Sequence, residues 1–189
     1  MLNNITGKVL EVYVECASYL PDWRPNQDYR QSVSAQKKLG GGVLLELSHE
    51  LDYLNWICGG WQTITAIGGH YSHLEINSDD SFSIMMTTER CPSVIVQMNY
   101  LDRISQREIV VNTDQHTIKV DFIKGTFQVD AEVEQVKVER NDTYLAQHQS
   151  ILDHQFDKLC TLAEGMDIME MIQAIENSAY ANQKKWEHK

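Results

Sequence analysis

The sequence predicts an α+β fold, in which one open and mostly antiparallel β-sheet carries helices packed on one of its faces. Three observations lead to this prediction. A first strand precedes a helix with an apolar stripe, a long run of short strands follows, and two helices close the chain. The length of 189 residues is that of one ordinary domain, so residues 1–189 are expected to form a single unit.

The first element is a half-buried strand over residues 7–16, which read GKVLEVYVEC. Apolar and polar side chains alternate there with a period of two, as in a strand that has one covered face. The following stretch, ASYLPDWRPNQDYRQSVSAQKKLGGG, contains two prolines and many polar residues. It predicts an ordered loop of unusual length, and loops this long in a compact domain are usually functional or disordered.

The next segment, VLLELSHELDYLNWICGG, predicts one continuous helix that ends at Gly59. Its apolar residues recur at three- and four-residue steps and mark the face toward the core. These residues are Leu44, Leu47, Leu51, Leu54 and Cys58. A turn of about 100° per residue gathers a second set on nearly the opposite face, with Glu46 one turn from His49. That set is Leu45, His49, Asp52 and Trp56.

Seven short strands are expected between Trp61 and Arg140, because alternating segments there are separated by turn signals such as NSDD, RCPS, NTDQ and IKGT. The segments are WQTITAIGGHY, DSFSIMMTTER, SVIVQMNYL, REIVVNT, HTIKVDF, GTFQVD and EVEQVKVER. Two helices follow, the first after residues 141–143 and the second after Asp167. The buried stripe of the second is expected at Ile168, Met171, Ile172 and Ile175.

Composition excludes several classes of function. A formal net charge of -11 would repel a nucleic acid backbone. No segment approaches the roughly 20 apolar residues of a membrane-spanning helix, and the N-terminus lacks the pattern of a signal peptide. The chain opens almost directly into a strand, which is typical of a domain that follows another one. Four well-separated cysteines, with no CxxC pair, favour a reduced, cytoplasmic compartment.

Two segments could carry chemistry near the predicted helix. Gly40, Gly41 and Gly42 would let the backbone approach a flat or anionic ligand and leave N–H groups facing it. His49 could exchange a proton with a substrate hydroxyl, with Asp52 or Glu46 orienting its ring. As bare patterns, a glycine run is commonly a tight turn, and a helical histidine beside a carboxylate is more often a structural pair.

The long loop adds candidates for substrate binding, which are Trp23, Arg24, Tyr29 and Arg30. Arginines suit phosphates or carboxylates, and aromatic faces suit sugar rings or bases. A loop held to the sheet by tryptophan packing and arginine hydrogen bonds is an equal alternative. Arg103 and Arg107 could face the same cleft, although charged residues at a strand end are more often solvated.

No metal site is expected. His70 and His73 form an H-x-x-H pattern near a strand end, but residues three apart on a strand point to opposite faces, and a third ligand is not evident.

The glycine triplet and the His-x-x-Asp of His49 and Asp52 resemble the second domain of the Gfo/Idh/MocA oxidoreductases. Over nearly the whole chain, the order of elements resembles that domain too, whose fold is like the C-terminal domains of dihydrodipicolinate reductase and glyceraldehyde-phosphate dehydrogenase. LPDWRPNQDYR and LSHELDYL resemble a subset from bacterial surface-polysaccharide and nonulosonate pathways. The pattern departs at Glu46, which lies three residues before the histidine where the family has an Asp four before.

The resemblance implies an oxidoreductase that acts on a sugar or nucleotide sugar with NAD or NADP. In the family a lysine of the N-terminal Rossmann domain transfers the proton while the histidine assists and binds substrate. Neither GxGxxG nor Glu-Lys-Pro occurs here, so that domain is absent from the chain. The chain alone is therefore expected to be inactive and to bind no cofactor.

The family also implies a homodimer or homotetramer that forms through the sheet. The alternative to an enzyme domain is a non-catalytic assembly or binding module, in which the open sheet face is a protein interface.

Overall fold

The computed structural model describes residues 7–139 and 141–182. In these ranges eight strands form one sheet, and all seven strands expected after Trp61 are present. Their bounds are β1 Val9–Ala17, β2 Trp61–Gly69, β3 Ser81–Thr88, β4 Val94–Asn99, β5 Gln106–Thr113, β6 Thr117–Asp121, β7 Thr126–Val129 and β8 Glu132–Gln135.

The order of strands across the sheet is β2-β3-β4-β1-β5-β6-β7-β8. β1 lies in the middle, parallel to β4 and antiparallel to β5. The other neighbouring strands pair antiparallel, and they are consecutive in the sequence. The predicted open and mostly antiparallel sheet is confirmed. Its centre is closed by two non-local pairings of β1, which short hairpins could not provide.

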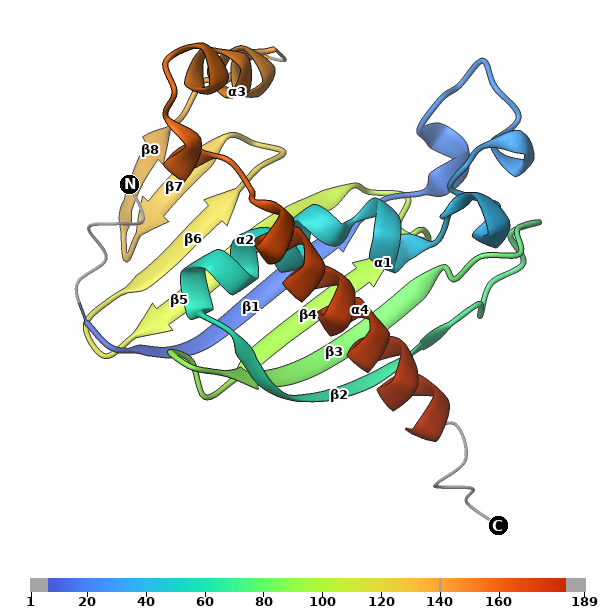
Figure 1. Cartoon of the computed structure of the whole chain (residues 1–189), viewed down its shortest axis with the longest axis horizontal. Helices are drawn as coiled ribbons and strands as arrows, with labels where there is room; N and C mark the ends of the chain where they lie inside the picture. The colour runs from blue at the N-terminus through green and yellow to red at the C-terminus, as the bar shows by residue number, and fades with distance from the viewer. Residues whose placement is uncertain (1–6, 140, 183–189) are drawn as a thin grey trace.

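The described helices are α1 Val43–Glu46, α2 Ser48–Cys58, α3 Asp142–Leu152 and α4 Leu162–Asn182. Short 3-10 turns lie at Leu20–Asp22, Tyr29–Gln31, Lys37–Leu39 and Phe156–Lys158. In Figure 1, α1, α2 and α4 cross the face of the sheet that is turned to the viewer, whereas α3 stands apart beyond β7 and β8. Within α3 only Ser150 is buried, so this helix does not share the core.

The core lies between the sheet and the helices α1, α2 and α4. Strand residues of one parity are buried against them, including Val12, Val14 and Cys16 of β1. All residues of the apolar stripe predicted between Leu44 and Cys58 are buried. The stripe predicted for α4 is buried as well. Burial of such side chains is the main stabilising contribution in a domain of this size.

The prediction of a single helix over residues 43–58 is wrong, because the segment forms two helices. They meet at Leu47, whose backbone has φ −103° and ψ 20° and which is buried. The break thus lies two residues before His49. The predicted second face is therefore not continuous, since Glu46 belongs to α1 while His49 and Asp52 belong to α2.

The second terminal helix also begins earlier than predicted, at Leu162 rather than after Asp167. Thr161 and Glu164 explain the start. The Glu164 carboxylate accepts hydrogen bonds from the Thr161 backbone N–H at 2.7 Å and hydroxyl at 2.8 Å, while the Glu164 N–H donates to the Thr161 hydroxyl at 3.2 Å. This reciprocal pair is a capping box, and its T-x-x-E pattern is visible in the sequence.

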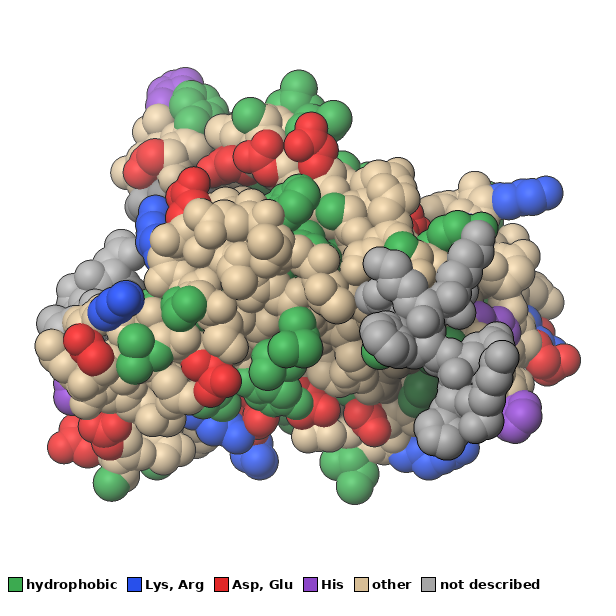
Figure 2. Space-filling model, turned by 90° about the horizontal axis from the view of Figure 1, so that it is seen from below, with side chains coloured by type: hydrophobic (Ala, Val, Ile, Leu, Met, Phe, Trp, Pro, Cys, Tyr) green, Lys and Arg blue, Asp and Glu red, His purple; other side chains and the backbone are tan. Residues whose placement is uncertain are grey.

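The face of the sheet opposite to the helices carries an apolar row. Register places Met85, Ile95, Tyr13 and Val110 side by side on β3, β4, β1 and β5. Met85 is 61% exposed, and the other three are half-buried. In Figure 2, which looks from the side where β2 runs in Figure 1, hydrophobic, acidic and basic side chains are interspersed. None of the described helices is long and apolar enough to cross a lipid bilayer.

Candidate active site

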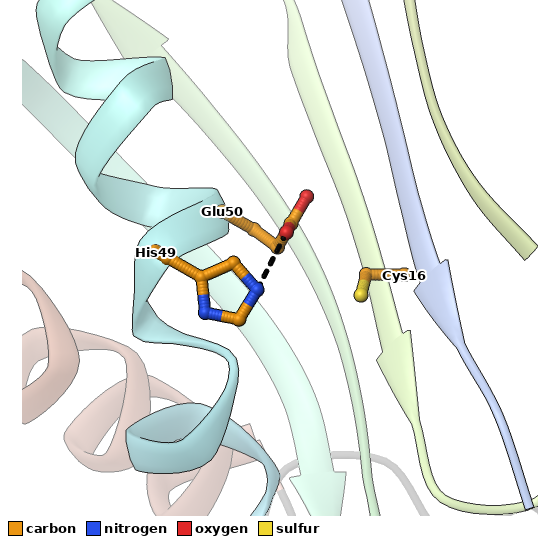
Figure 3. A group of neighbouring side chains, drawn as sticks. All are labelled: Cys16, His49 and Glu50. Carbon is orange, nitrogen blue, oxygen red and sulfur yellow. Dashed lines mark ion pairs between the residues drawn. The ribbon is translucent and has the colours of Figure 1, made fainter. Parts of the chain in front are cut away.

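A cluster of polar side chains forms where the first turn of α2 passes over the middle of the sheet. His49 and Glu50 come from this turn, and Cys16 comes from the neighbouring end of β1 (Figure 3). The imidazole is half-exposed, with 49% of its side chain accessible, whereas the Glu50 side chain is 0% exposed. The helix start thus presents one titratable group to the outside and one to the interior.

Glu50 is the centre of this cluster because three polar side chains contact its carboxylate. Its Oε1 lies 2.9 Å from His49 Nε2 and accepts a hydrogen bond from Arg107 Nε at 2.8 Å. Its Oε2 accepts a hydrogen bond of 2.7 Å from the Tyr53 hydroxyl. The Arg107 guanidinium also lies 4.8 Å from the centre of the Phe122 ring. A buried carboxylate with these partners is fully compensated.

The charge of Glu50 follows from these contacts. Burial by itself would raise its pKa, but the contacts with His49 and Tyr53 and the charge of Arg107 outweigh burial and lower the pKa. The pKa of Tyr53 is raised, first by burial and then by the negative charge of Glu50. Glu50 is therefore an ionised carboxylate at neutral pH, and Tyr53 is a neutral donor to it.

The same cluster could be considered for a metal, because one ligand atom each from Cys16, His49 and Glu50 lies within 4.8 Å of the others. Burial, followed by the charge of Glu50, raises the pKa of the Cys16 thiol to about 12. Arg107 already balances the Glu50 charge at 2.8 Å, so a cation would have to displace this ion pair. The donor set therefore favours the ion pair over a cation site.

The other two predicted catalytic carboxylates lie elsewhere. Asp52 faces the segment before α4, where its Oδ1 is 3.9 Å from the Cys160 thiol, a weak contact. Glu46 lies on the side of Tyr100, whose pKa is raised by burial and then by the charges of Glu46 and Asp79. Among the described residues neither carboxylate contacts His49. The carboxylate that contacts His49 in the structure is that of Glu50.

The glycine triplet has a packing role that the structure makes explicit. A Cβ at Gly41 would lie 2.1 Å from the Val33 carbonyl oxygen, and Gly40 and Gly42 adopt φ of 85° and 119°. The N–H groups of Gly40 and Gly41 donate to the carbonyls of Lys37 and Gln36. The expectation that these two N–H groups are free for a ligand is wrong, because they close the preceding 3-10 turn.

Three predicted substrate-binding residues have partners within the chain. Trp23 donates to the Ser18 hydroxyl at 2.8 Å and packs edge-on against Tyr100. The Tyr29 hydroxyl accepts from the Glu75 backbone N–H at 3.2 Å. Arg30 pairs with Asp28 at 2.8 Å and with Glu75 at 3.1 Å. These contacts hold the long loop in place, as the packing alternative expects, and they leave a role in substrate binding untested.

The remaining predicted residues are exposed. Arg24 lines a small hollow together with Trp23 and Tyr29. Arg103 lies with its guanidinium 4.1 Å above the Tyr19 ring. A larger groove of about 330 Å³ lies on another part of the surface, between the ends of β2 and β3 and the last turns of α4. His49 does not line it, so the structure does not bring the predicted residues into one pocket.

Sequence reasoning missed Glu50 and Tyr53, and it favoured a solvated Arg107. A signal for Glu50 was available. Glu50 lies three residues after Leu47 and four before Leu54, which places it on the apolar stripe. A charged residue on that stripe is buried and needs an ion-pair or hydrogen-bond partner. The identity of that partner could not be read from the spacing, because Arg107 is 57 residues away.

Residues 3–128 match the family model of the GFO/IDH/MocA C-terminal domain. The chain belongs to the GFO/IDH/MocA family. No match to a curated protein was found. The expectation from the glycine triplet and the His-x-x-Asp is thereby confirmed at the level of the family, and the C-terminal domain of these oxidoreductases is the part that this chain represents.

Solved structures of similar fold include several dehydrogenases. Levoglucosan dehydrogenase in complex with NADH has a TM-score of 0.79 at 14% identity, over 93% of this chain and 57% of that one. The WlbA dehydrogenase from Bordetella pertussis in complex with NADH and UDP-GlcNAcA has a TM-score of 0.69 at 16% identity, over 93% and 54%. UDP-N-acetylglucosamine 3-dehydrogenase GnnA from Acidithiobacillus ferrooxidans has a TM-score of 0.71 at 15% identity, over 93% and 55%. The GFO/IDH/MocA chain described here thus spans little more than half of their length.

Proposed function

We propose that this chain is the substrate-binding domain of an NAD- or NADP-dependent oxidoreductase that acts on a sugar or nucleotide sugar. The observation that carries the proposal is the half-exposed imidazole of His49, which a buried and ionised Glu50 holds at the start of α2. In this role His49 contacts a substrate hydroxyl and takes or returns its proton. Sugar and nucleotide-sugar dehydrogenases among the structures of similar fold support the substrate class.

In residues 7–139 and 141–182 no glycine-rich turn between a strand and a helix offers a cradle for a dinucleotide. The sequence lacks GxGxxG, and β1 is followed by 3-10 turns rather than by a glycine-rich turn that opens a helix. The residues present therefore do not fit the pyrophosphate, and we derive no step through the cofactor. We propose that a Rossmann domain outside residues 1–189 supplies that site, that the chain alone is inactive, and that the complete enzyme is cytoplasmic.

We propose that the remaining predicted residues contact parts of the substrate or cofactor away from His49. Arg103, Arg24 and the aromatic rings of the loop would bind the distal part of the substrate. Gly40, Gly41 and Gly42 would face the cofactor by close approach of their backbone, since two of their N–H groups are occupied.

The alternative is a non-catalytic assembly or binding module. It is favoured by the apolar row of Met85, Ile95, Tyr13 and Val110 on the open face, and by an exposed α3 that carries Tyr144 and Leu145 at 64% exposure each. The same row supports the homodimer or homotetramer proposed for the enzyme, so its existence alone does not discriminate between the two functions.

A binding experiment tests the proposed function on the chain itself. Calorimetry with UDP-, GDP- and CMP-sugars should give weak binding, because part of the site is missing, and His49→Ala should abolish it. Trp56→Ala is a matched control, since Trp56 also lies on α2, is 62% exposed and takes no part in the cluster. Equal behaviour of wild type and His49→Ala with every sugar would favour the assembly module.

A further inference from the structure

The contacts of Glu50 bear on which ring nitrogen of His49 carries the proton. Oε1 of Glu50 lies 2.9 Å from Nε2 of His49 and 2.8 Å from Nε of Arg107. An ionised carboxylate has only lone pairs to offer. At 2.9 Å a ring nitrogen without a proton would hold its lone pair beside that oxygen, so the contact favours the tautomer with the proton on Nε2.

We propose that Glu50 is a positioning residue that fixes His49 as the Nε2–H tautomer, which leaves Nδ1 as the atom that exchanges a proton with the substrate. This inference rests on the proposed function and specifies its reactive atom. Nδ1 is on the side of the ring turned away from Glu50 and Cys16 (Figure 3). The half-exposed ring gives a ligand access to it.

Arg107 and Tyr53 make this arrangement rigid. Arg107 holds the same oxygen that faces His49, and Tyr53 holds the other one, so the carboxylate cannot rotate away without breaking a contact. Phe122 packs against both, with its ring 6.0 Å from that of Tyr53 and 4.8 Å from the guanidinium of Arg107. Arg107 and Tyr53, which are themselves packed against Phe122, thus hold Glu50 in position. Glu50 does not need to touch the substrate to act in this way.

The proton exchange at Nδ1 involves only the substrate hydroxyl and the ring. When the substrate O–H bond breaks, the lone pair of Nδ1 takes the proton, the oxygen keeps the bonding electrons, and the ring becomes an imidazolium whose positive charge Glu50 stabilises. In the reverse direction Nδ1 returns the proton to the oxygen. Nε2 keeps its own proton throughout, so Glu50 stays ionised.

Nitrogen-15 NMR of the uniformly labelled chain tests the inference directly. At a pH where His49 is neutral, the wild type should show a one-bond N–H correlation at Nε2 of His49 and an unprotonated Nδ1. Glu50→Leu should lose the Nε2 correlation through rapid exchange. Tyr53→Phe, the matched control, removes only the contact to Oε2 and should keep it.

Two outcomes would overturn the inference. One is a wild type whose neutral His49 carries its proton on Nδ1, a result that does not depend on how any variant folds. The other is an Nε2 correlation in folded Glu50→Leu that equals the wild-type signal. Both are independent of turnover, so the inference and the proposed function can fail separately.

Discussion

Glu50 and Arg107, which are 57 residues apart in the sequence, meet at 2.8 Å beneath the first turn of α2. Glu50 lies on the helix that carries the histidine, and Arg107 lies on β5. Their ion pair therefore ties α2 to the sheet. It also holds the carboxylate that faces His49, so a single contact connects the stability of the domain to the geometry of the candidate site.

Removing Glu50 should destabilise the domain substantially. Glu50→Ala leaves the Tyr53 hydroxyl and the Arg107 guanidinium without their partner, and because the Arg107 side chain is 35% exposed, the loss should be about 1–3 kcal/mol. Urea unfolding followed by circular dichroism measures this loss. His49→Ala, at the next position in the sequence, should cost less than about 1 kcal/mol, because its ring is half-exposed. Equal losses for the two variants would contradict the central role of Glu50.

Stability should fall in acid because of the same carboxylate. The pKa of Glu50 is lower in the folded protein than its ordinary value of 4.5. Its contribution is therefore fully present above that value and is lost as the pH falls through the lower folded value. Urea midpoints measured at about pH 6.5 and about pH 3.5 bracket the ordinary value of a glutamate. Glu50→Gln should show a smaller decrease between the two than the wild type, and an identical decrease would exclude Glu50 as the cause.

Turnover should depend on His49 and little on Asp52. In a protein that joins this chain to a dinucleotide-binding domain, His49→Ala should lower kcat by about 10²–10⁴, the range for loss of a general acid–base group. Asp52→Ala should have a minor effect, since Asp52 contacts Cys160 rather than His49. Formation of the reduced cofactor, followed by absorbance, gives both values. A larger loss in Asp52→Ala would restore the role first predicted for it.

The glycine triplet should respond unevenly to alanine. At Gly41 the new Cβ would lie 2.1 Å from the Val33 carbonyl oxygen and 2.7 Å from that of Ser34, so the backbone must shift. Such overpacking typically costs about 1–3 kcal/mol. Gly40 has open space, and its alanine variant bears only the strain of φ 85°. Gly41→Ala should therefore have a lower midpoint of thermal unfolding than Gly40→Ala. The reverse order of the two midpoints would refute the packing role of Gly41.

Assembly through the open face should be sensitive to charge. Met85→Glu and Ile95→Glu place carboxylates in the apolar row without touching the core, because both side chains point away from the helices. If the row is buried in a homo-oligomer, these variants should sediment as monomers in analytical ultracentrifugation. Ile104→Glu, in the loop between β4 and β5 and 81% exposed, is the control and should leave the assembly unchanged. A wild type that sediments as a monomer would contradict the proposed homo-oligomer that forms through the sheet.

Much of the fold could be predicted because local periodicity determines it. Alternation with a period of two gave the strands after Trp61, and three- and four-residue steps gave the buried stripes from Leu44 to Cys58 and from Ile168 to Ile175. These patterns depend on neighbours within a turn or a strand. Of the candidate site, the same patterns located His49, since a turn of about 100° per residue places it on the face opposite to the apolar stripe.

The sequence by itself determined the type and order of the elements, the buried stripes and the identity of the exposed histidine. Only the tertiary structure decided that the helix breaks at Leu47, that β1 lies between β4 and β5, and that Glu50 rather than Asp52 or Glu46 faces His49. The physical reason is that these features depend on contacts between distant segments. A buried charge must find its counter-charge wherever the sheet brings one, and no local spacing encodes that position.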